Sequence, residues 1–232
     1  MTYDTVSLIL IVGGDTVSLC KGGQPLPKQT FYNLPQGKKE TLLHAVEKEF
    51  SRVPLHEASI ANIVKTANIP RGSFYQYFKN KEDAYFYLLN ERIEAKKKRF
   101  LGYLKEHDGN LFEAVTLIYE QSIYEEANEE GLQFLKNTLL NMTHEIEDKF
   151  SQIFNVNGTV EQFSELKQLI NTDNLTVQDK HELFHLVQLL AMVIVHNLVE
   201  KYAKNLTFDE AVENFSIQIN LLKTGLVKNN VN

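Results

Sequence analysis

The 232-residue sequence contains no tryptophan and a single cysteine, Cys20. One cysteine cannot close a bond within the chain, which excludes a disulfide framework and fits a reducing, cytoplasmic compartment. Proline is absent after Pro70, which favours an all-α structure for the rest of the chain. Burial of aromatic groups must depend on the 10 tyrosines and 14 phenylalanines.

Long hydrophobic runs are also scarce. Val6–Val12 is too short to cross a bilayer, and no basic stretch or small-residue cleavage site flanks it, so no signal peptide is expected. We expect no other membrane-spanning segment and no membrane partner. Catalytic patterns are missing too, because Gly13-Gly14 and Gly22-Gly23 match neither phosphate-binding glycine fingerprint and no nucleophile–base pairing appears. These absences argue against an enzyme.

The charge is distributed unevenly. Residues 27–81 carry nine Lys/Arg and four Asp/Glu, a net charge of +5, whereas residues 82–232 carry fourteen and twenty-four, a net charge of −10. A basic DNA-binding domain joined to an acidic domain with another role would show this split, although a surface asymmetry without function gives the same numbers. We expect a non-native or disordered extension at 1–26, a DNA-binding domain at 27–82 and a helical domain at 83–232, whose ligand-binding and dimerisation roles are implied by the family resemblance given below.

Hydrophobic periodicity predicts helices along most of the chain after residue 35. We expect them at 36–53, 58–69, 71–78 and from about 80 to 107, and then at 111–127, 131–153, 159–171, 176–204 and 207–228. Residues 182–202 are apolar nearly all round, so this helix must be buried on several sides. Packing against the same helix of a second copy is the simplest explanation.

The short helices in residues 36–78 have the spacing of a helix-turn-helix. The turn Asn68-Ile69-Pro70 leads into the helix Arg71–Phe78, where Phe74 and Phe78 at positions i and i+4 are the expected buried anchors. Gly72 is small enough to approach a phosphate backbone. The candidate hydrogen-bond donors to DNA are Arg71, Ser73, Tyr75, Gln76, Tyr77 and Lys81.

Residues 58–89, ASIANIVKTANIPRGSFYQYFKNKEDAYFYLL, resemble the DNA-binding signature of TetR-family repressors. The resemblance rests on the Ile-Pro-Arg-Gly-Ser-Phe-Tyr run, the following Tyr-Phe and the Lys-Asn-Lys-Glu, and it covers about 65 residues. Two positions depart from the family pattern. Asn68 replaces a frequent turn glycine but tolerates the left-handed conformation, and Pro70 replaces a Ser or Thr, so the next helix loses a side-chain cap.

The resemblance implies a homodimer whose recognition helices enter successive major grooves of a palindromic operator. It also implies that Ser73, Tyr75, Tyr77 and Lys81 hold phosphates. We expect Arg71 and Gln76 to read bases, since Arg suits guanine and Gln suits adenine. Ser59, the expected N-cap of the preceding helix, and Gly72 complete the predicted DNA-binding set. The alternative is that both tyrosines simply pack on the first helix.

The second part of the chain offers one candidate ligand site. His181 and His185 lie four residues apart, and His196 follows on nearly the same helix face, with Gln188 and Met192 between them. Histidines at this spacing can share a metal ion or ligate a haem iron. The other interpretation is a polar seam that meets solvent or a dimer partner.

The resemblance extends to family members that repress efflux pumps, some of which respond to haem. The position where such a sensor would carry its histidine is occupied by Lys97, so haem ligation does not transfer. No cofactor is required, and haem remains a possible effector. A large hydrophobic inducer inside the helical body is the general expectation.

Two other functions fit the same residues. A helical enzyme or transport-associated protein could carry an incidental helix-turn-helix, and a TetR-like activator could use the same DNA-binding domain. The sequence cannot separate an activator from a repressor.

The pentapeptide DTVSL occurs twice, at Asp4–Leu8 and Asp15–Leu19. One permitted coding of Tyr3–Leu8 contains ATGACAC-A-GTGTCAT, whose core GACAC-A-GTGTC is the inverted repeat that a two-fold dimer needs. The second copy lies eleven codons on, or 33 base pairs, which is about three turns of B-DNA. We interpret the repeat as an operator through which the protein controls its own gene.

The following residues fit a translated control region. Lys21-Gly22-Gly23 can be encoded by the purine-rich AAA GGA GGN of a ribosome-binding sequence, and Leu26 by the alternative start codon TTG. We therefore expect native translation to begin at residue 26. The alternative is a genuine N-terminal β-hairpin with its turn in IVGGD.

Overall fold

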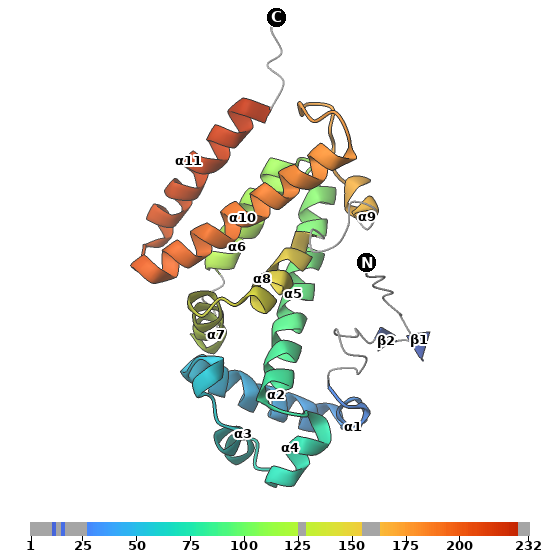
Figure 1. Ribbon diagram of the computed structural model, residues 1–232, viewed down its shortest axis with the longest axis vertical. Helices are drawn as coiled ribbons and strands as arrows, with labels where there is room; N and C mark the ends of the chain where they lie inside the picture. The colour runs from blue at the N-terminus through green and yellow to red at the C-terminus, as the bar shows by residue number, and fades with distance from the viewer. Residues whose placement is uncertain (1–10, 13–14, 17–26, 125–128, 155–162, 227–232) are drawn as a thin grey trace, which may run out of the picture. The chain divides into compact units, whose positions relative to one another are not determined.

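The computed structural model describes residues 11–12, 15–16, 27–124, 129–154 and 163–226 (Figure 1). Two compact units are present, of which the first ends at Leu89 and the second begins at Asn90. Helix α5 (Lys81–Glu106) contributes residues to both units. Apart from one two-residue β-ladder, the described residues form helices and their connections, which confirms the all-α expectation.

The β-ladder lies in the N-terminal segment. Strand β1 (Ile11–Val12) pairs antiparallel with β2 (Asp15–Thr16), so that Ile11 faces Thr16 and Val12 faces Asp15. This is the pairing that the hairpin alternative requires. The rest of residues 1–26 lies outside the described residues, including the first copy of the DTVSL repeat and the last three residues of the second, and the start of native translation stays a prediction.

The described helices of the first unit that precede α5 surround a small core, and all of them except α2 are short. They are α1 (Gln29–Tyr32), α2 (Gln36–Arg52), η1 (Leu55–Glu57, a 3₁₀ helix), α3 (Ile60–Thr66) and α4 (Arg71–Tyr77). Helix α2 packs against α3, and α4 packs against both α1 and α3. This is the helix-turn-helix arrangement that the sequence predicts, with α1 and η1 as additions.

Phenylalanines form the core of this unit, as the lack of tryptophan requires. Phe74 and Phe78 of the predicted recognition helix are fully buried, which confirms them as anchors. The Phe78 ring lies 5.2 Å from that of Phe31 on α1 and 5.5 Å from that of Phe74, measured between centroids. Phe50 of α2 packs edge-on against Tyr85 of α5. These contacts fix the back of α4 and leave its other face to solvent.

A buried carboxylate connects α2 to the start of α3. Glu49 is only 4% exposed and accepts hydrogen bonds from the Arg52 guanidinium at 2.8 and 3.0 Å, from the Ser59 backbone N–H at 2.8 Å and from the Asn62 amide at 3.1 Å. Burial raises the pKa of Glu49, but the hydrogen bonds from Arg52, Ser59 and Asn62 outweigh it, so the pKa lies below its ordinary value. The negative charge also stands at the N-terminus of α3, where the helix dipole favours it.

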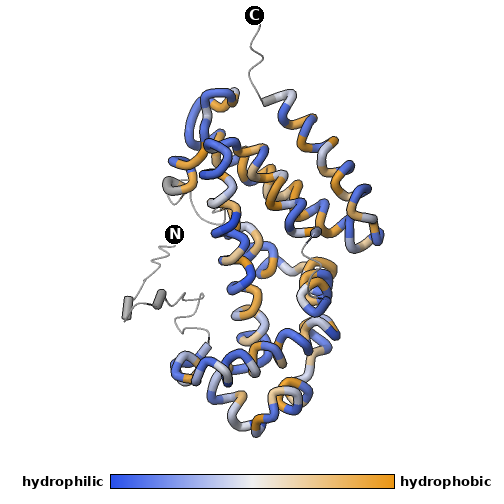
Figure 2. The backbone as a smooth tube through the Cα atoms, turned by 180° about the vertical axis from the view of Figure 1, so that it is seen from behind, coloured by the Kyte–Doolittle hydropathy of each residue, from blue (hydrophilic) through white to orange (hydrophobic). Residues whose placement is uncertain are grey.

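The second unit consists of the remainder of α5 and the helices that follow. Their bounds are α6 (Leu111–Tyr124), α7 (Glu129–Leu140), α8 (His144–Ser151), η2 (Gln152–Phe154, 3₁₀), α9 (Ser164–Lys167), α10 (Lys180–Lys204) and α11 (Phe208–Leu226). Helix α10 packs against α6, α7, α8 and α11, and α11 also packs against α6. Figure 2 shows hydrophobic residues along α10, interrupted by hydrophilic ones.

Local signals set the ends of α10. The Asp179 carboxylate accepts hydrogen bonds from the backbone N–H groups of His181 and Glu182, and these bonds lower its pKa. The helix therefore begins at Lys180, four residues later than the predicted 176. It ends where Asn205 adopts a left-handed conformation with φ of 51°.

The predicted helix 131–153 is wrong, because two helices occupy this range. Helix α7 ends at Leu140 and α8 begins at His144. Thr143 caps α8 by accepting a hydrogen bond from the Ile146 N–H at 3.3 Å. Side chains such as Thr compete with helical backbone bonds in this way, and a periodicity count does not register it.

The predicted helix 159–171 is much shorter in the described residues, where only Ser164–Lys167 is helical. The next turns approach the loop after α5 closely. Asn171 donates its N–H to the Gly109 carbonyl at 2.9 Å, and Gly109 has a φ of 76°. The N–H groups of Leu169 and Ile170 bond locally to the carbonyls of Leu166 and Lys167, and the Asn171 N–H bonds to the other segment rather than continuing a helix. Residues 159–162 lie outside the described part.

The expectation that no further segment could span a membrane by length and composition is wrong for α10. Its most apolar 18-residue window has a mean hydropathy of 1.7. Half of that window is buried inside the unit against neighbouring helices. The core helix of a folded domain meets the same criterion, so this feature is weak evidence for a membrane span.

Candidate functional site

The turn before α4 has the geometry expected of it. Asn68 adopts the left-handed conformation with φ of 52°, and the Ile69 N–H donates to the Val64 carbonyl at 3.1 Å. Pro70 occupies the N-cap of α4 without a side-chain cap. Asn68 and Pro70, the two departures from the family pattern, therefore behave as predicted: Asn68 adopts the left-handed turn, and Pro70 leaves α4 without a side-chain cap.

Helix α4 presents the predicted DNA-reading residues on its open side. Arg71, Gly72 and Gln76 are exposed. Gln76 can offer an amide to an adenine edge and Arg71 a guanidinium to a guanine edge. Because the opposite side of the helix is held by Phe74 and Phe78, this face is rigidly presented. Base contact stays a prediction.

The predicted phosphate-binding residues of α4 are less uniform. Tyr75 is 38% exposed, its ring stands edge-on to Phe74 and its hydroxyl lies 3.5 Å from the Arg71 guanidinium. Ser73 and Tyr77 are half-buried. All three retain some exposed surface, and their phosphate contacts remain predictions.

Lys81 has a structural role in this unit. Its ammonium donates to the carbonyls of His56 at 2.9 Å and Ala58 at 3.1 Å. It therefore holds the segment before α3 to the start of α5. The predicted phosphate contact would compete with, or add to, these two bonds.

Ser59 occupies the N-cap of α3, as predicted, but makes no capping hydrogen bond with its side chain. Its backbone N–H is bound by Glu49 instead. The hydroxyl is thus not committed to capping α3. Its predicted DNA contact remains untested.

The contacts that secure the end of α4 were not predicted. The Lys28 ammonium donates to the Tyr75 carbonyl at 2.7 Å, and the Lys28 N–H donates to the Tyr77 carbonyl at 2.8 Å. The Thr30 hydroxyl donates to the Gln76 carbonyl. The last carbonyls of a helix have no partner within it, so residues 28 and 30 act as its C-terminal cap. A long-range cap of this kind has no local sequence signal.

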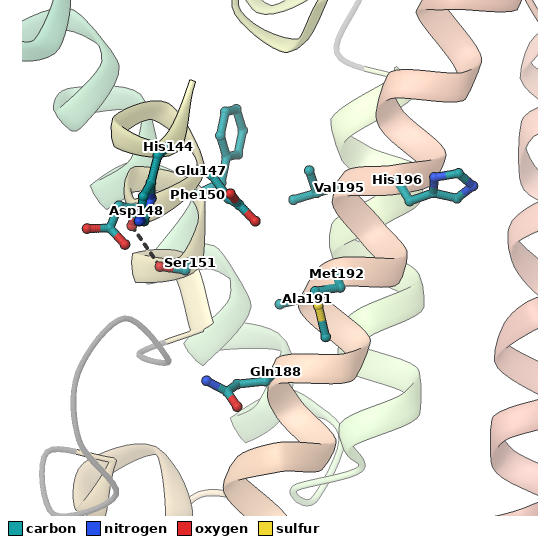
Figure 3. Close-up of a pocket in the computed structure, with 10 residues that line it drawn as sticks. All are labelled: His144, Glu147, Asp148, Phe150, Ser151, Gln188, Ala191, Met192, Val195 and His196. Atoms are coloured by element: carbon teal, nitrogen blue, oxygen red, sulfur yellow. Dashed lines mark hydrogen bonds between the residues drawn. The ribbon is translucent and has the colours of Figure 1, made fainter. Parts of the chain in front are cut away.

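In the second unit, a pocket of about 670 Å³ lies between α8 and α10 (Figure 3). Helix α8 contributes His144, Glu147, Asp148, Phe150 and Ser151, and α10 contributes Gln188, Ala191, Met192, Val195 and His196. Figure 3 shows Gln188 and Val195 directed from α10 toward α8, with the His196 ring turned away from α8. The lining combines two kinds of side chain. We call the apolar ones (Phe150, Ala191, Met192 and Val195) the floor of the pocket and the polar ones its rim.

The predicted ligand residues are only partly brought together. Met192 and His196 line the pocket, whereas His181 and His185 are exposed and do not. His185 is engaged through Nδ1 with the Gln188 amide oxygen at 2.9 Å. Among the described residues no group of three or more His, Cys, Asp or Glu could hold a metal ion. The arrangement favours the polar-seam interpretation of these histidines.

Two family models match the chain. The model described as bacterial regulatory proteins, tetR family, matches residues 42–86, which contain the helix-turn-helix. The model described as Tetracyclin repressor-like, C-terminal domain, matches residues 110–226, half of the chain.

Individual relatives agree with these matches. Over 64 residues the chain is 31% identical to the HTH-type transcriptional repressor NemR of Escherichia coli (strain K12), a stretch that spans 28% of this chain and 32% of NemR. The structure of reduced E. coli NemR aligns with a TM-score of 0.58 and 18% identity, over 84% of this chain and 100% of that one.

Two further solved structures share the fold. SmeT, the repressor of the Stenotrophomonas maltophilia multidrug efflux pump SmeDEF, aligns with a TM-score of 0.62 and 14% identity, over 83% of this chain and 92% of SmeT. FadR of Bacillus subtilis, solved with stearoyl-CoA, aligns with a TM-score of 0.56 and 19% identity, over 79% and 96% of the two chains. At these identities the likeness concerns the fold alone.

Proposed function

Because this chain belongs to the tetR family of bacterial regulatory proteins, we propose that it is a cytoplasmic, ligand-responsive repressor that binds a palindromic operator as a homodimer. The observation that carries the proposal is the exposed face of α4. Arg71 and Gln76 stand in solvent on a helix whose back is locked by two buried phenylalanines. A helix that offers bidentate donors on a rigid support is what base reading in a major groove requires.

The proposed contacts divide into two kinds. Arg71 and Gln76 read bases, while Ser73, Tyr75 and Tyr77 hold phosphates and fix the register of the helix. The net charge of +5 on residues 27–81 supports attraction to the DNA backbone. Loss of a base-reading side chain should relax specificity at one position, whereas loss of a phosphate contact should weaken binding to every sequence.

The two last helices support the homodimer. Helix α10 exposes Leu189 and Met192, which are 47% and 55% exposed, and α11 exposes Ile217 and Leu221, at 53% and 71%. We call these four residues the dimer rows. The spacings of three and four residues place each pair on one face of its helix. A second copy of this chain, packing its own rows against them, would remove this apolar surface from water.

The proposed operator is GACAC-A-GTGTC, which can be encoded beneath the DTVSL repeat. Because this sequence would lie in the regulator's own control region, the proposal includes repression of its own gene. Two same-facing copies three turns apart could each bind one dimer. The likeness in fold to SmeT, the repressor of a multidrug efflux pump, extends the proposal to a transport or efflux gene.

Release from DNA would follow from a population shift. DNA-bound and inducer-bound dimers would differ in the separation of their recognition helices. An inducer that prefers the wrong separation lowers operator affinity by the factor by which DNA lowers inducer affinity. Helix α5, which contributes to both units, is the element through which the change would pass.

The inducer is proposed to be a large hydrophobic molecule, and haem remains one candidate. Titration of the purified protein with haemin tests it directly. A Soret shift that saturates near one haem per chain would support haem as the inducer. The absence of a shift near that ratio would exclude haem.

A gel shift with DNA from upstream of the protein's own gene, at low salt, tests the proposal. We expect retardation that persists against excess unrelated DNA. Its absence would favour the alternative of a helical enzyme or transport-associated protein. Deletion of the gene separates repressor from activator, because transcription from its promoter should rise without a repressor and fall without an activator.

A further inference from the structure

We propose that the pocket between α8 and α10 binds an amphipathic organic cation, a bulky apolar molecule with a permanent positive charge. This inference rests on the proposed function, since it gives the chemical class of the inducer. It depends on the size of the pocket, the apolar character of its floor and the charge on its rim.

The size and floor fit a bulky hydrophobic molecule. The volume of about 670 Å³ lies within the range of roughly 300–1,000 Å³ that small-molecule pockets occupy. Phe150 from α8 and Ala191, Met192 and Val195 from α10 supply apolar groups. The thioether of Met192 is flexible and can adapt to the shape of a ligand.

The rim gives the sign of the charge. Glu147 and Asp148 both line the pocket from α8, and neither has an ion-pair partner among the described residues. No Lys or Arg is among the described residues that line it. Residues 82–232 as a whole carry a net charge of −10, which adds to the negative potential of the two carboxylates.

The same rim disfavours anionic ligands. A carboxylate or phosphate in the pocket would meet two like charges without a cationic partner to bind it. Haem carries two propionates and would meet this repulsion here. The Gln188 amide is neutral and can bind a polar group of either kind, so it does not reverse the preference.

Two probes of matched shape and opposite charge test the inference. Tetraphenylphosphonium and tetraphenylborate are titrated into the full-length protein by calorimetry at pH 8 and low salt, above the usual titration range of imidazole. We expect the cation to bind about tenfold or more tightly than the anion, since each partly solvated carboxylate contributes up to about 1 kcal/mol. Added salt should narrow the difference.

Three variants locate the site. Glu147→Gln and Asp148→Asn should each weaken phosphonium binding about two- to fivefold. Glu145→Gln is the matched control, because it removes the same charge from the same exposed helix outside the pocket lining, and it should bind like the unchanged protein. Equal affinity for the two probes, no phosphonium binding, or equal effects of Glu147→Gln and Glu145→Gln would each overturn the assignment.

The DNA assay separates this inference from the proposed function. If the protein retards its operator but does not bind phosphonium, the cation assignment fails and the repressor stands. If phosphonium binds at Glu147 and Asp148 but no operator is retarded, the repressor fails and the pocket assignment stands. Release of operator DNA by phosphonium, and not by borate, would support both.

Discussion

At the scale of single residues, Glu49 holds the helix-turn-helix together. It is a buried carboxylate that bonds a side chain on its own helix, a backbone N–H at the start of α3 and a side chain within α3. Loss of one partner of such a group leaves buried donors without an acceptor. Its hydrogen bonds also make its contribution dependent on pH.

Replacement Glu49→Gln should lower the free energy of unfolding by about 1–3 kcal/mol at pH 7, because an amide cannot accept from all three donors. The pKa of Glu49 is lowered in the folded protein from its ordinary value of 4.5. Its contribution is therefore complete above that pH and declines as pH falls below it. Urea unfolding followed by circular dichroism at several pH values measures this difference.

The difference in the free energy of unfolding between the unchanged protein and Glu49→Gln should become smaller in acid. A gap that widens as pH falls would contradict the lowered pKa. Glu40→Gln, at an exposed position on the same helix, is the control and should change stability little at either pH.

Gly109 is the second residue on which the fold depends. Its φ is 76°, and a Cβ there would lie 2.5 Å from the Asn171 nitrogen and 2.6 Å from the Leu169 carbonyl oxygen. Replacement Gly109→Ala should therefore destabilise the second unit by about 2 kcal/mol or more, through backbone strain and displacement of the neighbouring segment. Thermal unfolding measures the effect.

Gly102 supplies the opposite control. It lies within α5, and its added Cβ would meet only the Glu106 side chain, at 4.0 Å. Gly102→Ala should raise stability by about 0.5–1 kcal/mol, because alanine favours the helix. Equal effects of the two substitutions would show that the close approach at Gly109 is not a constraint.

At the scale of elements, the recognition helix depends on residues that lie 46 to 49 positions earlier in the chain. Helix α4 has only seven residues and no N-terminal side-chain cap. Its stability therefore depends strongly on the hydrogen bonds that its C-terminal carbonyls accept. Lys28 and Thr30 bind three of them. We therefore expect α4 to bind DNA only while these contacts from the start of α1 hold it in place.

Thr30→Val removes the hydroxyl that binds the Gln76 carbonyl while keeping the shape of the side chain. It should cost about 1 kcal/mol of stability and weaken operator binding about fivefold, as the end of α4 frays. Fluorescence anisotropy with labelled operator measures the affinity. Thr41→Val is the control, since Thr41 binds only the Gly37 carbonyl within α2, and an equal loss there would contradict the capping role.

The sequence predicted which segments of the chain form helices, but it did not predict where some of these helices begin and end. Periodicity located α2, α3, α4, α5, α10 and α11 to within a few residues. It failed at 141–143, where Thr143 caps a new helix, and at 168–171, where the Asn171 N–H donates to the Gly109 carbonyl. Both failures arise from hydrogen bonds that compete with the helix and leave the hydrophobic pattern intact.

Some features of the candidate site could likewise be predicted from the sequence, and others could not. The turn at Asn68, the missing cap at Pro70 and the anchors Phe74 and Phe78 followed from local chemistry. The caps from Lys28 and Thr30, the carbonyl contacts of Lys81 and the α8–α10 pocket depend on residues distant in the chain, so a single sequence could not reveal them.

At the scale of the whole molecule, the dimer rows define the assembly. Leu221 is 71% exposed on α11, more than any other large hydrophobic residue of the dimer rows. Leu221→Glu would place a charge in the proposed interface and should convert a dimer of about 53 kDa, twice 26.7 kDa, into monomers. Light scattering coupled to gel filtration measures the mass.

Leu140→Glu is the control for that experiment. Leu140 is 42% exposed at the end of α7, outside the dimer rows, and the variant should remain dimeric. A dimer that survives Leu221→Glu but is lost with Leu140→Glu would place the interface elsewhere.

The central claim is that a dimer reads a two-fold DNA sequence through α4, and one titration tests it most directly. The protein is titrated against a duplex centred on ATGACACAGTGTCAT and against a duplex of the same composition with both half-sites scrambled, at one salt concentration. We expect two chains per specific duplex and binding at least about a hundredfold tighter than to the scrambled DNA. Equal affinity for the two duplexes would contradict it.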